Sequence, residues 1–140
     1  MADYYQHFSV MLENLNTNEE QWARAKLKRL QEAEDPESGG TLMDSDFVFE
    51  ISENGRCWDV WFNDAGGQSN IEHVANFVQS FLKKFRPQDH WGMEWASTCS
   101  KPRLDAYGGG AVFVTAKKQT WLNTGSWLAN KLAPRGRKPR

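Results

Sequence analysis

A chain of 140 residues with 39% hydrophobic and 25% charged residues has single-domain size and enough apolar side chains for a core, which excludes wholesale disorder. Its net charge of −1 hides an asymmetry, because residues 1–70 hold 14 Asp/Glu and 5 Lys/Arg (a balance of −9), whereas residues 71–140 hold 4 and 12 (a balance of +8). Only two cysteines, and no apolar run near the roughly 20 residues of a membrane span, exclude a disulfide-stapled secreted domain and a membrane protein.

Residues 1–34 predict a helical hairpin. Apolar side chains recur there at steps of three and four residues, as on one helical stripe: Tyr4, Tyr5, Phe8, Met11, Leu12 and Leu15. Thr17 and Glu20 have the spacing of a capping box, so a second helix is expected to begin there and to run to about Glu34. Residues 35–41 contain one proline and two glycines and predict a linker.

Two alternating runs follow the linker and predict strands over 47–52 and 57–62. Asn54-Gly55 between them is typical of a tight hairpin, because such a turn needs positive φ. Residues 69–85 then predict the main core helix. Ser69 and Glu72 would form its capping box, and its apolar stripe would be Ile71, Val74, Ala75, Val78, Phe81, Leu82 and Phe85.

The stretch from Trp91 to Trp121 has the most distinctive composition in the chain. Alternation around Trp91–Ala96 and Ala111–Thr115 predicts two strands. Gly108–Gly110 between them predicts a turn or bulge, and the alternative of a phosphate-cradling loop lacks the Gly-Lys-Ser/Thr sequence leading into a helix. A short helix is expected over 124–132, followed by a mobile basic tail over 134–140, which has no apolar anchor.

These elements predict one α+β domain over residues 1–133. Its expected centre is a four-stranded, mainly antiparallel sheet made of two hairpins and packed by helices, since hairpins favour antiparallel pairing. The helical hairpin at the N-terminus would lie on this sheet. The charge asymmetry indicates either one acidic and one basic surface or two halves whose charges interleave in the fold.

Aromatic and cationic residues of the Trp91–Trp121 stretch are the candidate binding residues. Aromatic faces stack on bases or fill pockets in a partner, while Lys and Arg contact phosphates or acidic surfaces. The alternative for the aromatic residues is a place in the core, and for the cations a solvated surface. The set comprises Trp91, Trp95, Lys101, Arg103, Tyr107, Lys117 and Lys118.

Cys99 is the candidate nucleophile of a small enzyme, with His90 or His73 as its base. Nothing in the spacing of these residues requires them to meet. The histidines and cysteines also lack the close ligand pairs of zinc sites, so neither a metal nor a cofactor is expected. Cys57 has no assigned role.

Two segments carry a resemblance to known proteins. TCSKPR at 98–103 with GGGAVFVTA at 108–116 resembles a group of small proteins carried by phages and integrative elements. WGMEW at 91–95 with the later strand is similar, more weakly, to the phage-associated Api92-like family, which has a ferredoxin-type fold. The resemblance covers the chain from residue 69 onward and brings no assigned reaction. It implies a protein of a bacterial mobile element.

Three functions follow as hypotheses. The first is a non-enzymatic, cytoplasmic protein that binds and blocks a host protein or ribonucleoprotein complex, with an anti-CRISPR-type inhibitor as its sharpest form. The second is a single-stranded nucleic-acid-binding protein, against which the pI of about 6.3 argues. The third is a small cysteine-dependent enzyme. No membrane partner is expected, and the sequence does not indicate an oligomeric state.

Overall fold

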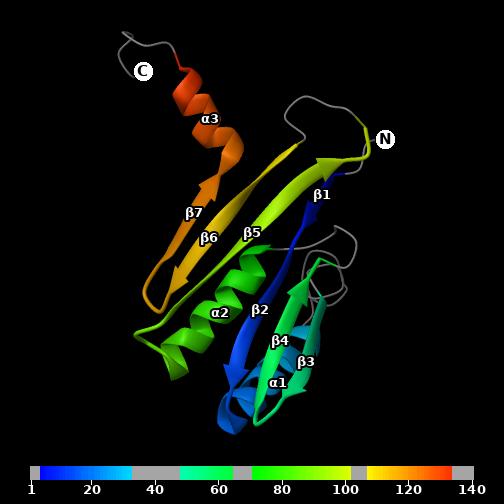
Figure 1. Ribbon diagram of the computed structural model, residues 1–140, viewed down its shortest axis with the longest axis vertical. Helices are drawn as coiled ribbons and strands as arrows, with labels where there is room; N and C mark the ends of the chain where they lie inside the picture. Colours follow the sequence, from blue (N-terminus) through cyan, green and yellow to red (C-terminus); the bar gives the residue numbers. More distant parts are fainter. Residues whose placement is uncertain (1–3, 33–47, 65–70, 102–106, 134–140) are drawn as a thin grey trace.

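The computed structural model describes residues 4–32, 48–64, 71–101 and 107–133 (Figure 1). Within these ranges the chain forms three helices and seven strands, and the strands make two antiparallel sheets. The α+β class is therefore confirmed. The predicted linker at 35–41, the predicted cap residue Ser69, Arg103 and the tail at 134–140 lie outside the described residues.

The strands divide into a four-stranded and a three-stranded sheet. The first has the order β1 (Tyr4–His7), β5 (His90–Cys99), β6 (Gly108–Thr115) and β7 (Gln119–Asn123). The second has the order β2 (Ser9–Leu15), β4 (Cys57–Asn63) and β3 (Val48–Asn54). The helices are α1 (Thr17–Glu32), α2 (Ile71–Phe85) and α3 (Thr124–Leu132). Both predicted hairpins exist, but they lie in different sheets, so the single four-stranded sheet was wrong.

The predicted N-terminal helical hairpin was also wrong, because residues 4–15 are β1 and β2, although its second helix is confirmed as α1. The pairing of β2 with β4 shifts between Leu12 and Leu15, where Asn14 has a φ of 61°. This β-bulge inserts an extra residue and so turns Leu15 back toward the core, three positions after Leu12. A strand with such a bulge therefore mimics the spacing of a helical stripe.

The β3–β4 hairpin confirms the turn predicted at Asn54-Gly55. Asn54 pairs with Cys57, which leaves Gly55 and Arg56 as the two turn residues. Gly55 has a φ of 65°, and positive φ at the first turn residue alone is the pattern of a type II′ turn. Such a turn matches the twist of the strands it joins.

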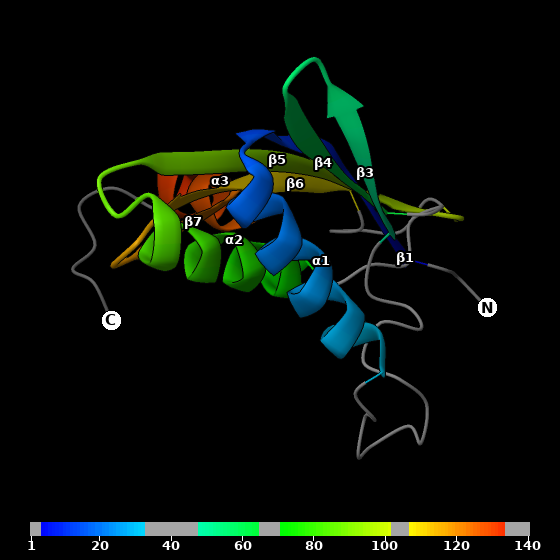
Figure 2. The same cartoon turned by 90° about the horizontal axis from the view of Figure 1, so that it is seen from below.

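The predicted core helix is confirmed as α2. Val78 and Phe81 are fully buried in one cluster with Val112 of β6. Figure 2 shows α1 and α2 together on one side of the sheets. Trp22 of α1 joins the two helices, because its ring lies 5.6 Å from that of Phe77 and 6.0 Å from that of Phe81.

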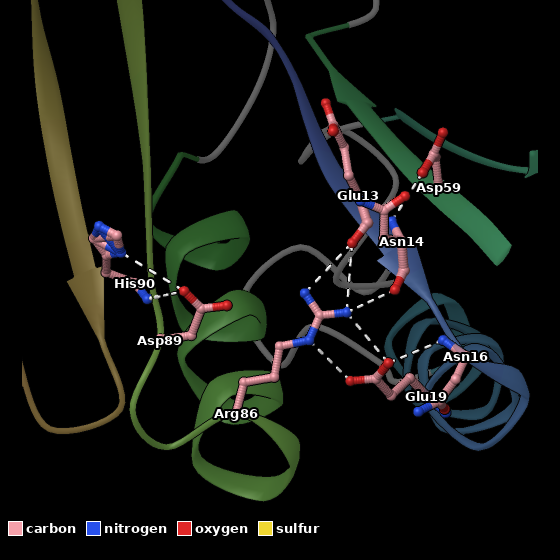
Figure 3. Close-up of polar contacts among 8 residues, drawn as sticks. All are labelled: Glu13, Asn14, Asn16, Glu19, Asp59, Arg86, Asp89 and His90. Atoms are coloured by element: carbon pink, nitrogen blue, oxygen red, sulfur yellow. Dashed lines mark hydrogen bonds and ion pairs between the residues drawn. The ribbon is translucent and has the colours of Figure 1, made fainter.

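A polar network fastens the end of α2 to the start of α1 (Figure 3). The guanidinium of Arg86 bonds both oxygens of the buried Glu19 carboxylate, at 3.0 and 3.2 Å, and donates to the Asn14 carbonyl at 2.9 Å. Glu19 and Asn16 form a reciprocal capping box with two bonds of 2.9 Å. The cap therefore lies one residue before the predicted pair of Thr17 and Glu20.

No helix within the described ranges combines the length and the apolar character that crossing a membrane requires.

Candidate functional site

The predicted cationic residues lie at opposite ends of β6. Lys101 and Tyr107 flank the connection between β5 and β6, whereas Lys117 and Lys118 lie in the turn after β6. The eight residues of β6 separate these groups by roughly 23 Å. The Tyr107 hydroxyl donates to the Cys99 carbonyl at 3.1 Å, so Tyr107 links the end of β5 to the start of β6. The described cations therefore do not form one patch.

Trp91 and Trp95 both lie on the helix-covered face of β5, and both are half-buried. The Trp91 indole N–H donates to the Met11 carbonyl at 2.9 Å. This bond connects β5 to β2 and hence the two sheets. Trp91 therefore has a structural role, which agrees with the alternative that this aromatic residue belongs to the core.

Trp95 forms a pair with Trp121 of β7. Their ring centroids lie 5.7 Å apart, with the planes inclined at 58°. The ring of Trp95 lies so close over Gly110 that a Cβ there would collide with it. This close approach is why glycine is needed on β6. The predicted turn or bulge was wrong, because Gly108–Gly110 belong to strand β6 and pair with Trp95–Ser97 of β5.

Hydrogen bonds through Gln119 connect the Trp121 ring to α2. Its indole N–H donates to the Gln119 side chain at 3.1 Å. The Gln119 amide in turn donates to Asn76 at 2.8 Å and to Gln79 at 3.0 Å. Trp121 is still 41% exposed, so this chain of bonds fixes an aromatic face that water contacts.

The two rings line a hollow of about 630 Å³, here called the indole groove. It lies between the start of α2 and the junction of β7 with α3. Its polar lining residues are Gln6, Glu72, Asn123 and Ser126, and its apolar ones are Ile71, Trp95, Trp121 and Leu122. Leu122 borders the groove with its backbone, because its side chain lies on the opposite face of β7 from that of Trp121. Glu72 is the only charged residue among these described residues, so they combine aromatic faces with one carboxylate.

Such a groove suits a ligand that has both apolar and cationic character. Indole faces bind apolar groups by burial and cations by their negative π face. The carboxylate at the rim adds a charge-assisted acceptor. Among the described residues no Lys or Arg lines the groove, so it lacks a cation to pair with a phosphate.

Sequence reasoning selected Trp95 but missed Trp121 and Glu72 as site residues. Trp121 meets Trp95 only because β6 lies between β5 and β7 with Val112 opposite both Met93 and Trp121. The strand β7 was not predicted, so this register was not accessible. Glu72 was assigned only a capping role.

The structure also forms a hydrogen-bonded chain that the sequence did not predict. His7 contacts Asp64 through Nδ1 at 3.3 Å and Thr98 through Nε2 at 2.8 Å. The order of carboxylate, imidazole and hydroxyl is that of a hydrolase triad. However, Asp64 also accepts from the backbone N–H of Phe8 at 3.0 Å, at the step from β1 to β2. These hydrogen bonds therefore stabilise the backbone around Phe8, where the polypeptide passes from β1 in one sheet to β2 in the other.

The predicted pairing of Cys99 with His90 is not formed. These residues are the two ends of β5, roughly 30 Å apart along its ten residues. His73, the other predicted base, lies half-buried on α2, and Cys99 is buried. Among the described residues, no group of three or more His, Cys, Asp or Glu side chains is placed to hold a metal ion.

Comparison of the chain with protein-family models, with curated proteins and with solved structures gave no match. Function therefore has to follow from the residues and their geometry.

Proposed function

We propose that this is a non-enzymatic binding protein that holds a segment of a partner protein in the indole groove. The segment would carry an apolar side chain next to a Lys or Arg. The observation that carries the proposal is the Trp95–Trp121 pair, fixed from α2 and exposed beside the Glu72 carboxylate. Pre-positioned aromatic side chains of this kind dominate the energetics of many protein interfaces.

The charge of the groove supports a protein partner over a nucleic acid. A single-strand binder combines stacking rings with cations that follow the phosphate backbone. Here the one charged residue that lines the groove, within the described part of the chain, is acidic. An anionic backbone would be repelled by Glu72, whereas a basic peptide would be attracted.

The resemblance to mobile-element proteins extends this proposal to a host complex as the partner. In that form the protein binds and blocks a host protein or ribonucleoprotein, such as a CRISPR effector. Retention of the partner after nuclease treatment of a host lysate would separate a direct protein contact from one bridged by RNA.

The test begins with selection from a random dodecapeptide library on the wild-type protein. We expect the enriched peptides to carry Lys or Arg beside an apolar residue. Trp121→Ala should weaken binding of the best peptide about 30-fold, the equivalent of a 2 kcal/mol hot spot. Glu72→Lys should abolish the preference for a cationic residue.

A second hollow provides the matched control. It has about 650 Å³ and is lined by Trp61 and Glu50 on the three-stranded sheet. Trp61→Ala and Glu50→Lys should leave peptide affinity unchanged. If they weaken binding as much as the changes at Trp121 and Glu72, or if the latter have no effect, the indole groove is not the binding site.

Single-stranded nucleic-acid binding is the second candidate, and the C-terminal charge favours it. Residues 106–140 contain seven Lys/Arg and no Asp/Glu. Binding of an oligothymidylate would then fall steeply with salt, and Lys117→Glu with Lys118→Glu would reduce the salt slope. Peptide binding in the indole groove would show neither effect, so one titration at two salt concentrations separates the candidates.

A further inference from the structure

Helix α3 has no buried residue, although one of its faces is apolar. Trp127 is 54%, Leu128 49% and Leu132 72% exposed. At 100° per residue these side chains share a stripe with Lys131, roughly opposite Ser126, which lines the indole groove. The stripe is therefore a separate surface. Figure 1 shows α3 continuing beyond the end of β7, away from α1 and α2.

The connection to β7 prevents α3 from folding back onto its own sheet. Asn123 is both the last residue of β7 and the N-cap of α3, accepting from Ser126 N–H at 3.0 Å. Thr124, the first helical residue, exchanges two bonds of 3.0 Å with the backbone of Gly109. No linker residue is left between β7 and α3 to reverse the chain, and the stripe stays exposed.

The same chain exposes a complementary sheet surface, here called the outer face, on the side of β5–β7 opposite α2. Phe113 and Leu122 lie on it and are about half-exposed. Together with neighbouring residues of β2, this face borders a shallow hollow of about 620 Å³. Of the described residues that line the hollow, Glu94 alone is charged, and in the strand register it lies beside Ala111 and Leu122.

We infer that two copies of this chain associate by placing α3 of each across the outer face of the other. Lys131 of one copy then meets Glu94 of the second. The length of α3 matches the width of the outer face, because its nine residues extend about 14 Å and the strands β5, β6 and β7 span about 10 Å from axis to axis. A two-fold axis uses each surface twice, so the roughly 1,000 Å² that a specific interface needs is within reach.

This dimer goes beyond the proposed function and uses a different surface, so the two stand or fall separately. Sedimentation equilibrium of the purified full chain should show a wild-type dimer. Glu94→Lys and Lys131→Glu, each alone, should raise the dimer dissociation constant at least tenfold, because each replaces two attractive contacts by two repulsive ones. Leu128→Glu should give a monomer with an unchanged circular-dichroism spectrum.

An equimolar mixture of the two charge variants is the sharpest arm. A heterodimer of Glu94→Lys with Lys131→Glu has opposite charges at both contacts, so mixing should restore the wild-type dissociation constant. Glu50→Lys, on the other sheet, is the control and should dimerise normally. Three outcomes would each overturn the inference. The wild-type protein could be a monomer even at 100 times the dissociation constant of the best peptide, its dimer could keep the same dissociation constant in both charge variants, or the mixture could stay monomeric.

Discussion

At the scale of single residues, the Arg86–Glu19 pair shows how one ion pair can hold three elements. Arg86 ends the α2 segment, Glu19 caps α1, and the Asn14 carbonyl belongs to the bulge of β2. Asp59 completes this junction by accepting from the Asn14 N–H at 3.0 Å. The strained φ of Asn14 is therefore supported on both sides of the backbone.

Arg86→Ala should lower the free energy of unfolding by about 3 kcal/mol, because it leaves the buried Glu19 carboxylate without its cation. The matched control is Arg24→Ala, which removes an exposed pair with Glu20 at 2.8 Å. That change should cost about 0.5 kcal/mol or less. Urea unfolding of both variants measures the difference, and equal losses would mean that the Arg86 pair does not hold the junction.

At the scale of elements, α2 is the centre of the core, and its residues pack against both sheets and α1. Phe81→Ala should cost about 3–5 kcal/mol, from lost transfer energy and the cavity left behind. Phe113→Ala removes the same ring from the exposed outer face and should cost well under that. Chemical denaturation at a concentration too low for self-association makes the comparison. A loss below 1 kcal/mol for Phe81→Ala would contradict the central place of α2.

The elements also show what the sequence could and could not predict. Helix α2 and strands β3 to β6 were predictable because their hydrophobic periods are regular and their turns carry Asn-Gly or Pro signals. The β2 strand was not, because the bulge at Asn14 breaks the two-residue period. The pairing of β1 with β5 and of β2 with β4 joins residues far apart in the chain, which local patterns do not encode.

At the scale of the whole molecule, the four-stranded sheet and α2 bring Trp95, Trp121 and Glu72 to one groove, and β6 separates Lys101 from Lys117 and Lys118. The sequence predicted that a surface of the Trp91–Trp121 stretch would bind, and Trp95 is a member of the indole groove. Which side chains line the groove depends on the order and register of β5, β6 and β7, and local sequence patterns do not encode either.

The seven tryptophans make the central claim directly measurable, because each indole N–H gives its own nuclear magnetic resonance signal. The best peptide from the library is titrated into uniformly 15N-labelled protein. Binding in the indole groove should shift the Trp95 and Trp121 signals and leave those of Trp22 and Trp61 in place. If Trp61 or Trp127 shifts on binding while Trp95 and Trp121 stay unchanged, the indole groove is not the site at which this protein holds its partner.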